Sequence, residues 1–158
     1  MELFVVRHGD SPFTAATDHQ RPLSELGEVQ AAKSGAFIAQ QGISTEVQIV
    51  CSDATRTHST ALIIAGKLGH CAVTAQAELY GARTGQWCEV IEHHQQLSQL
   101  ILVGHNPTMS LLARHLFPLK AFQFQPACVA HFTLEIDPQG LRLPAQYKQF
   151  YSPHATSQ

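Results

Sequence analysis

Short, continuously apolar runs alternate along this chain with stretches of helical periodicity, and this alternation limits its possible folds more than any other feature. The runs cover residues 3–6, 47–51, 71–74 and 100–103. Strands that are apolar throughout have both faces covered, as in a parallel sheet between helical layers. We therefore expect a three-layer α/β/α sandwich with a mostly parallel central sheet.

Helix signals lie between the apolar runs. Ser24 is a typical N-cap residue, and Gly42 is a typical stop for the helix that begins there. Apolar residues recur within this stretch at helical spacing: Leu26, Val29, Ala32, Ala36 and Phe37. We expect three further helices: one capped by Ser52 or Asp53 and ending at Gly69, one over residues 86–97, and one beginning at Asn106-Pro107.

Residues 127–136 and 141–150 flank the turn sequence Asp137-Pro138-Gln139-Gly140. Two such segments predict a C-terminal hairpin that adds antiparallel pairing at one edge of the sheet.

Composition suits one domain spanning residues 1–158, since 44% of the residues are hydrophobic and 14% are charged. The formal net charge of −2 argues against a nucleic-acid partner or an anionic membrane surface. No apolar run approaches the roughly 18 residues of a membrane span. The four cysteines form no C-x-x-C pair, which favours a reducing compartment, so we expect a cytoplasmic protein.

Polar side chains follow three of the predicted strands directly. Arg7 and His8 follow the first strand, Arg56 lies one helical turn beyond the second, and His105 follows the fourth. Ligands of such sheets bind at the carboxyl ends of the strands. Two arginines and two histidines at this edge predict an anion site, because guanidinium groups bind phosphate oxygens bidentately.

A histidine in such a site can act as the nucleophile on phosphorus. The second histidine and the arginines would stabilise the charge on the transferred phosphoryl group, so no cofactor and no metal ion is implied.

Three motifs carry a family resemblance. Arg7-His8-Gly9 after an N-terminal strand, Ser52-x-x-x-Arg56 and Val103-Gly104-His105-Asn106-Pro107 resemble, in order and spacing, the signature of the histidine phosphatase superfamily. The second motif departs from the family pattern in having Asp53 in place of a proline. The resemblance implies a phosphoglycerate-mutase-like fold, with His8 as nucleophile and with Arg7, Arg56 and His105 completing the phosphate pocket.

Within this superfamily the chain looks like the SixA-type protein-phosphohistidine phosphatases. It shares their short length, the Arg7-His8-Gly9-Asp10 start and the segment Asp18-x-x-Arg21-Pro22-Leu23-Ser24. The resemblance implies hydrolysis of a P–N bond on a phosphorelay or phosphotransfer protein, with inorganic phosphate as product. Gly9, Arg21 and Asn106 are further candidates for phosphate or substrate binding, although Arg21 is equally suited to brace its loop against Asp18.

Two other functions stay open. Phosphate esters usually need a general acid, and Glu78 is the candidate in the segment where the superfamily has its carboxylate. If Glu78 points into the site, a small-molecule phosphate ester is the expected substrate. The other alternative is a module that binds phosphate or phosphoprotein without turnover.

Seven of the remaining histidines raise the question of a metal. They are His58, His70, His93, His94, His115, His131 and His154. His93 and His94 are adjacent, so on a helix they point about 100° apart, and no typical ligand spacing occurs. We therefore expect no metal site among them.

Overall fold

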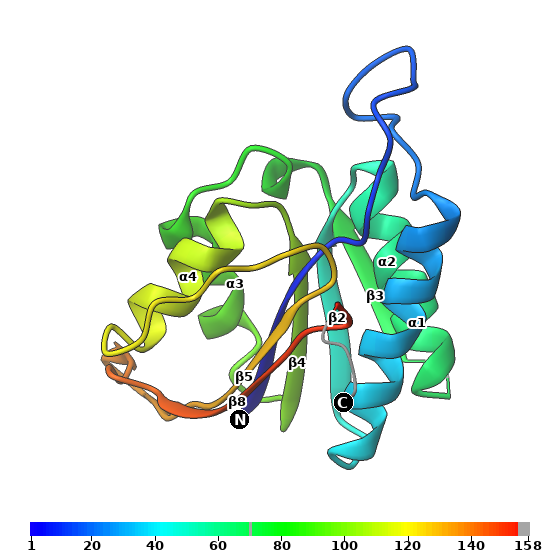
Figure 1. Cartoon of the computed structure of the whole chain (residues 1–158). Coiled ribbons are helices and arrows are strands. Elements are labelled where there is room, and N and C mark those ends of the chain that lie inside the picture. Colours follow the sequence, from blue (N-terminus) through cyan, green and yellow to red (C-terminus); the bar gives the residue numbers. More distant parts are fainter. Residues whose placement is uncertain (70, 155–158) are drawn as a thin grey trace.

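The computed structural model describes residues 1–69 and 71–154, and its sheet has helices on both faces (Figure 1). The strands of the main sheet are β1 (Glu2–Arg7), β2 (Val47–Ser52), β3 (Ala72–Gln76), β4 (Gln99–Gly104), β5 (Val129–Thr133) and β8 (Gln146–Tyr151). They lie in the order β3-β2-β4-β1-β5-β8. The four strands from β3 to β1 pair in parallel, whereas β5 pairs antiparallel with β1 and with β8. This confirms the mostly parallel sheet with an antiparallel C-terminal edge.

The C-terminal hairpin is also confirmed. Its tip forms a separate two-stranded ladder of β6 (Ile136–Asp137) and β7 (Gly140–Leu141), at the turn sequence that predicted it. Gly140 has a φ of +118°, a conformation that favours glycine.

The helices are α1 (Glu25–Gln40), α2 (Thr55–Lys67), α3 (Thr84–His93) and α4 (Thr108–Leu116), with a short 3₁₀ helix at Ala77–Leu79. The helices form two layers that cover the sheet: α1 and α2 pack on one face, and α3 and α4 pack on the other (Figure 1). In the described parts of the chain no helix is long and apolar enough to cross a membrane.

Strand β1 illustrates why both faces had to be covered. Leu3 and Val5 join the apolar cluster formed with α3 and α4, whereas Phe4 and Val6 join the cluster formed with α1 and α2. Successive side chains of a strand point to opposite faces, so a continuous apolar run buries both sides.

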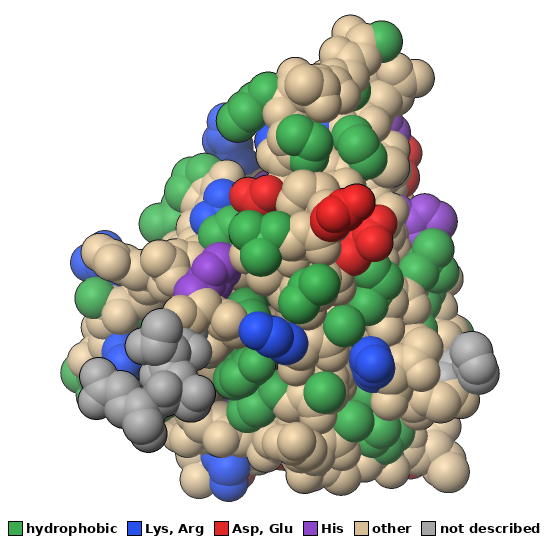
Figure 2. Space-filling model, turned by 45° about the vertical axis from the view of Figure 1, so that its right-hand side comes forward, with side chains coloured by type: hydrophobic (Ala, Val, Ile, Leu, Met, Phe, Trp, Pro, Cys, Tyr) green, Lys and Arg blue, Asp and Glu red, His purple; other side chains and the backbone are tan. Residues whose placement is uncertain are grey.

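The buried face of α1 differs from the expected one. Leu26 and Val29 are 59% and 52% exposed. Hydrophobic side chains, coloured green, are also visible among polar ones on the face shown in Figure 2. The face that packs inward instead carries small and polar residues, among them Gly27, Ser34 and Gly35. These residues let the helix backbone approach its neighbours closely, and Ile38 adds one large buried apolar side chain to the same face.

Two helix starts also differ from the prediction. Neither Ser52 nor Asp53 is the N-cap of α2, where Ala54 takes that position without a side-chain bond. The hydroxyl of Ser52 instead hydrogen-bonds Thr57 and His105. Helix α4 begins at Thr108, with Pro107 at the N-cap, while Oδ1 of Asn106 accepts a hydrogen bond from the N–H of Ser110.

Helix α3 also ends earlier than predicted. It runs over Thr84–His93 rather than 86–97. Nδ1 of His94 lies 2.7 Å from the carbonyl oxygen of Val90 and satisfies one of the last carbonyls of the helix.

Candidate active site

His8 lies at the carboxyl end of β1, where its backbone N–H donates to the carbonyl of Gly104 on β4. Its ring is buried, with 8% of the residue exposed. Nδ1 lies 2.7 Å from the carbonyl oxygen of Gly9, which can only accept a hydrogen bond. Nδ1 therefore carries the proton, and the lone pair of a neutral ring is on Nε2.

The surroundings keep this ring neutral. Burial, and to a lesser degree the positive charges of Arg56 and Arg7 and the neighbouring His105, lower the pKa of His8 to about 3. A neutral imidazole with its lone pair on Nε2 is the form that can attack an electrophile.

Arg56 is brought to this ring by the first turn of α2 and is itself buried, at 6% exposed. Its Nε donates to Nε2 of His8 at 3.3 Å. The rest of its guanidinium faces Asp18: Nη1 donates to the backbone carbonyl at 2.7 Å and Nη2 to Oδ2 at 3.1 Å. One guanidinium thus connects the His8 ring with the loop between β1 and α1.

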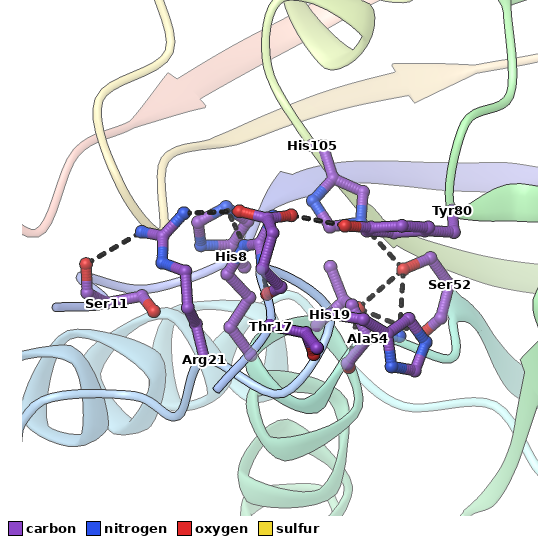
Figure 3. Close-up of polar contacts among 12 residues, drawn as sticks. His8, Ser11, Thr17, His19, Arg21, Ser52, Ala54, Tyr80 and His105 are labelled. Carbon is purple, nitrogen blue, oxygen red and sulfur yellow. Dashed lines mark hydrogen bonds and ion pairs between the residues drawn. The ribbon is translucent and has the colours of Figure 1, made fainter. Parts of the chain in front are cut away.

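His105 follows β4 and faces His8 with a centroid separation of 5.4 Å. Its Nε2 shares a 2.7 Å hydrogen bond with Oγ of Ser52, which in turn bonds Oγ1 of Thr57 (Figure 3). Burial first, and then the charge of Arg56, lower the pKa of His105 to about 4. Within the described part of the chain its Nδ1 is buried and makes no hydrogen bond.

Arg7 is held on the opposite side by the segment before β5. Its Nη1 donates to the carbonyl of Phe124 at 2.8 Å, and Nδ2 of Asn106 donates to the same oxygen at 3.1 Å. Among the described residues Nε of Arg7, like Nδ1 of His105, is buried without a partner. Buried donors of this kind suit an anion, since polar groups away from water need partners.

Gly9 and Asn106, candidates from the sequence, have their own bonds within the protein. The N–H of Gly9 donates to Oγ1 of Thr60 at 3.1 Å, and its carbonyl accepts from His8. Oδ1 of Asn106 accepts from Ser110. In this structure the N–H of Gly9 is thus bonded within the protein, and Nδ2 of Asn106 donates one hydrogen bond, to the carbonyl of Phe124.

Arg21 braces its loop. Its Nε and Nη2 donate to the carbonyls of Pro12 and Ser11 at 3.0 and 2.9 Å, and its Nη1 pairs with Oδ1 of Asp18 at 3.0 Å. The guanidinium also stacks on Phe13, 4.0 Å from the ring centroid. Of the two roles considered for Arg21, the geometry supports the brace against Asp18.

Tyr80, and not the predicted Glu78, is the residue of this segment that contacts the site. Glu78 lies in the 3₁₀ helix, is exposed, and makes no hydrogen bond or ion pair with the described residues. Tyr80 reaches the site instead, where its hydroxyl donates to Oδ2 of Asp18 and its ring stands edge-on to His105 at 5.6 Å (Figure 3). No pattern in the sequence pointed to Tyr80, apart from its position two residues after Glu78.

Other histidines have structural partners. His131 pairs with Glu2 and His19 with Asp53, each at 2.8 Å. No group of three metal-ligating side chains gathers in the described ranges, and His70 lies outside them.

Comparisons with known proteins show the family of this chain. Residues 3–99 match the family model of the histidine phosphatase superfamily (branch 1). The uncharacterised protein Rv1276c of Mycobacterium tuberculosis is 32% identical over 114 residues, which cover 68% of this chain and 67% of that protein.

Two solved structures show the fold. The protein histidine phosphatase SixA complexed with tungstate has a TM-score of 0.82 at 22% identity and covers 97% of both chains. The mycobacterial glucosyl-3-phosphoglycerate phosphatase Rv2419c has a TM-score of 0.69 at 16% identity, covering 96% of this chain and 99% of that one.

The family match stops short of His105, which the structure nevertheless places beside His8 as the third motif requires. With the matched residues covering more than half of its length, the chain belongs to the histidine phosphatase superfamily and is a phosphatase by that membership.

Proposed function

We propose that this phosphatase hydrolyses the P–N bond of phosphohistidine on a protein through a covalent phospho-His8 intermediate, without a metal ion. The observation that carries the proposal is the state of His8: its ring is neutral, its proton is on Nδ1, and Nε2 faces the guanidinium of Arg56.

In the first step the lone pair of Nε2 attacks phosphorus, and the bond to the substrate imidazole breaks. The bonding electrons return to the leaving nitrogen. A substrate ring that carries a proton on its other nitrogen leaves as neutral imidazole, and no proton from the enzyme is needed. The positive charge of the phosphorylated His8 ring is stabilised by its Nδ1–H bond to the carbonyl of Gly9.

In the second step water attacks phosphorus, and the electrons of the P–Nε2 bond return to His8. The proton that water loses stays with the phosphate released. Arg56 and Arg7 supply positive charge next to the phosphoryl oxygens, and His105 can donate from the edge of its ring when its proton is on Nδ1. Guanidinium groups fill the role that a metal ion has in other phosphatases.

The acids near the site favour a P–N bond over a P–O bond. The carboxyl group of Asp18 has its pKa held well below the usual range by Tyr80, Arg21 and Arg56, so it is ionised at neutral pH. Glu78 is exposed and makes no polar contact with the described site residues. An alkoxide leaving group needs a proton, and neither carboxyl group is arranged to give one.

A small phosphate ester is the second candidate, because Rv2419c, with the same fold, is a glucosyl-3-phosphoglycerate phosphatase. Such a substrate requires a proton donor, and Glu78 and Tyr80 lie in the segment that would supply it. Activity on alkyl phosphates that Glu78→Ala abolishes would favour this candidate.

The deciding experiment follows phosphate release from a phosphohistidine-bearing protein with EDTA present. Wild type is compared with His8→Ala and with His93→Ala, whose exposed side chain lies at the end of α3. We expect release and a transient acid-labile phosphoryl label on wild type and His93→Ala, and neither on His8→Ala. Equal release by His8→Ala would disprove the nucleophile, and loss in EDTA restored by a divalent metal would disprove the metal-free reaction.

A further inference from the structure

The carboxylate of Asp18 already occupies donors that a phosphoryl group would use. Its Oδ1 accepts from Nη1 of Arg21 at 3.0 Å, and its Oδ2 accepts from Nη2 of Arg56 at 3.1 Å and from the Tyr80 hydroxyl (Figure 3). Arg56 is the residue that also contacts Nε2 of His8. The phosphate-binding guanidinium therefore has an internal anion as its partner in this structure.

A second anion at Arg56 conflicts with this carboxylate. Every nitrogen of the Arg56 guanidinium is engaged: Nε with His8, Nη1 with the backbone carbonyl of Asp18, and Nη2 with its carboxylate. A phosphoryl dianion that used Nη2 would meet a like charge within contact distance, which is unfavourable. One of the two anions has to leave Nη2.

The carboxylate is the partner that can move. Arg56 is buried, with 7% of its side chain exposed, whereas 53% of the Asp18 side chain is exposed. Ion pairs with an exposed member contribute little to stability, on the order of 1 kcal/mol or less, so a dianion can displace one. The loop itself need not open, because the backbone of Asp18 stays bonded to Nη1 and the carbonyl of His19 accepts from the N–H of Thr55.

A resting place for the displaced carboxylate is also present. Arg21 is fixed within the loop by the carbonyls of Ser11 and Pro12 and by stacking on Phe13. It contacts Oδ1 of Asp18 rather than the oxygen that faces Arg56. A side-chain rotation can thus release Arg56 while the ion pair with Arg21 persists.

We propose that the Asp18 carboxylate is an internal competitor of phosphate, which occupies the Arg56 side of the pocket before substrate binds and returns to it as phosphate leaves. The proposal rests on the phosphate pocket of the proposed function. Its consequence is weak retention of the product, because free phosphate must compete for Arg56 with the carboxylate of Asp18, which the loop between β1 and α1 holds nearby.

The test measures binding of inorganic phosphate and of tungstate by calorimetry, at fixed ionic strength and pH. Asp18→Asn keeps the size of the side chain and removes its charge, and Asp53→Asn is the matched control, since Asp53 pairs with His19 and makes no bond to Arg56. We expect Asp18→Asn to bind both oxyanions about fivefold more tightly, near the upper end of what exposed ion pairs contribute. Asp53→Asn should bind as wild type does.

Weaker or unchanged binding by Asp18→Asn would overturn the proposal, because the carboxylate would then serve to hold Arg56 in place. If wild type still hydrolyses phosphohistidine, that result would overturn the competitor alone and leave the proposed function standing. Tighter binding by Asp18→Asn, with no hydrolysis of phosphohistidine by wild type, would support the competitor and overturn the proposed function. Absence of binding by every variant would overturn the competitor and the phosphate pocket together.

A crystal of wild type soaked in tungstate supplies a second measurement, independent of any variant. We expect tungstate next to Nε2 of His8, with Oδ2 of Asp18 more than about 4 Å from Nη2 of Arg56 and thus outside ion-pair distance. Tungstate bound there with the 3.1 Å contact intact would overturn the proposal.

Discussion

Nε of Arg56 lies 3.3 Å from Nε2 of His8, so a buried positive charge is in contact with the nitrogen that carries the lone pair of the proposed nucleophile. Burial is the main reason that the pKa of the His8 ring is lowered, and the charge of Arg56 adds to it. The contact also orients Nε2 toward the guanidinium that we propose to bind the phosphoryl group, whose nitrogens lie in one plane and point in different directions.

We expect Arg56→Ala to lower turnover by roughly 10²-fold or more, as removal of a single charge-stabilising donor does elsewhere. Arg56→Lys should recover little of this activity, since one ammonium group cannot contact both His8 and a phosphoryl oxygen in the same geometry. Steady-state kinetics on a phosphohistidine protein measures both variants. Near-normal rates in Arg56→Ala would remove Arg56 from the pocket.

Arg7→Ala should cost a comparable factor, roughly 10²-fold or more in turnover. Arg7 lies on the opposite side of the site from Arg56, and its guanidinium is held there by the carbonyl of Phe124. Lys120→Ala is a suitable control, because it removes an exposed positive charge elsewhere on the same connection. Equal effects of the two substitutions would mean that Arg7 acts only through the net charge of the protein.

Stability should fall as the pH falls below about 6.5. Burial lowers the pKa of His8 to about 3, whereas the unfolded chain takes up a proton on this ring near its usual 6.5. Between these values the unfolded state binds more protons, so the free energy of unfolding rises with pH by about 1.4 kcal/mol per pH unit for this ring. His105, with its pKa near 4, adds to the slope in the same direction.

Denaturant unfolding of ligand-free wild type and His8→Asn between pH 4.5 and 7.5 measures this effect. We expect the slope between about pH 4.5 and 6 to be smaller in His8→Asn, because one of the two buried rings is gone. Identical slopes would mean that the His8 ring is protonated in the folded protein, contrary to its proposed role.

The strands were predictable because a continuous apolar run has one good explanation, a strand covered on both faces, as Phe4 and Val5 illustrate. The positions of Arg7, His8, Arg56 and His105 followed from the rule that strand ends meet at one edge. The buried face of α1 did not follow, because it packs through Gly27 and Gly35 while Leu26 and Val29 stay exposed. The contact of Tyr80 with Asp18 could not be predicted either, since no local pattern decides which side chain of an irregular segment turns inward.

Ser52 should matter through His105. Its hydroxyl shares a hydrogen bond with Nε2 of His105 and belongs to a buried chain with Thr57. We expect Ser52→Ala to lower turnover about tenfold, the cost of one hydrogen bond left unmade at the pocket, and to broaden the pH dependence of kcat/KM as the ring loses its fixed orientation. Ser44→Ala, which removes an exposed hydroxyl bonded to Ser98, is the control. Unchanged kinetics in Ser52→Ala would show that His105 is oriented by other contacts.

The close approach between Gly27 of α1 and the loop after His8 should be sensitive to a single methyl group. A Cβ at Gly27 would collide with the backbone of Asp10. Because the nearest atoms are backbone atoms, no flexible side chain can move aside to relieve the collision. We expect Gly27→Ala to destabilise the fold by about 1–3 kcal/mol, as overpacking does, and to lower turnover because the displaced loop carries His8 and Gly9. Gly66→Ala is the matched control, since a Cβ there meets nothing within 4 Å and its helical position favours alanine by roughly 0.5–1 kcal/mol. Chemical denaturation of the two variants gives opposite signs if the loop is held against α1 as described, and equal small effects would mean that this contact is looser in solution.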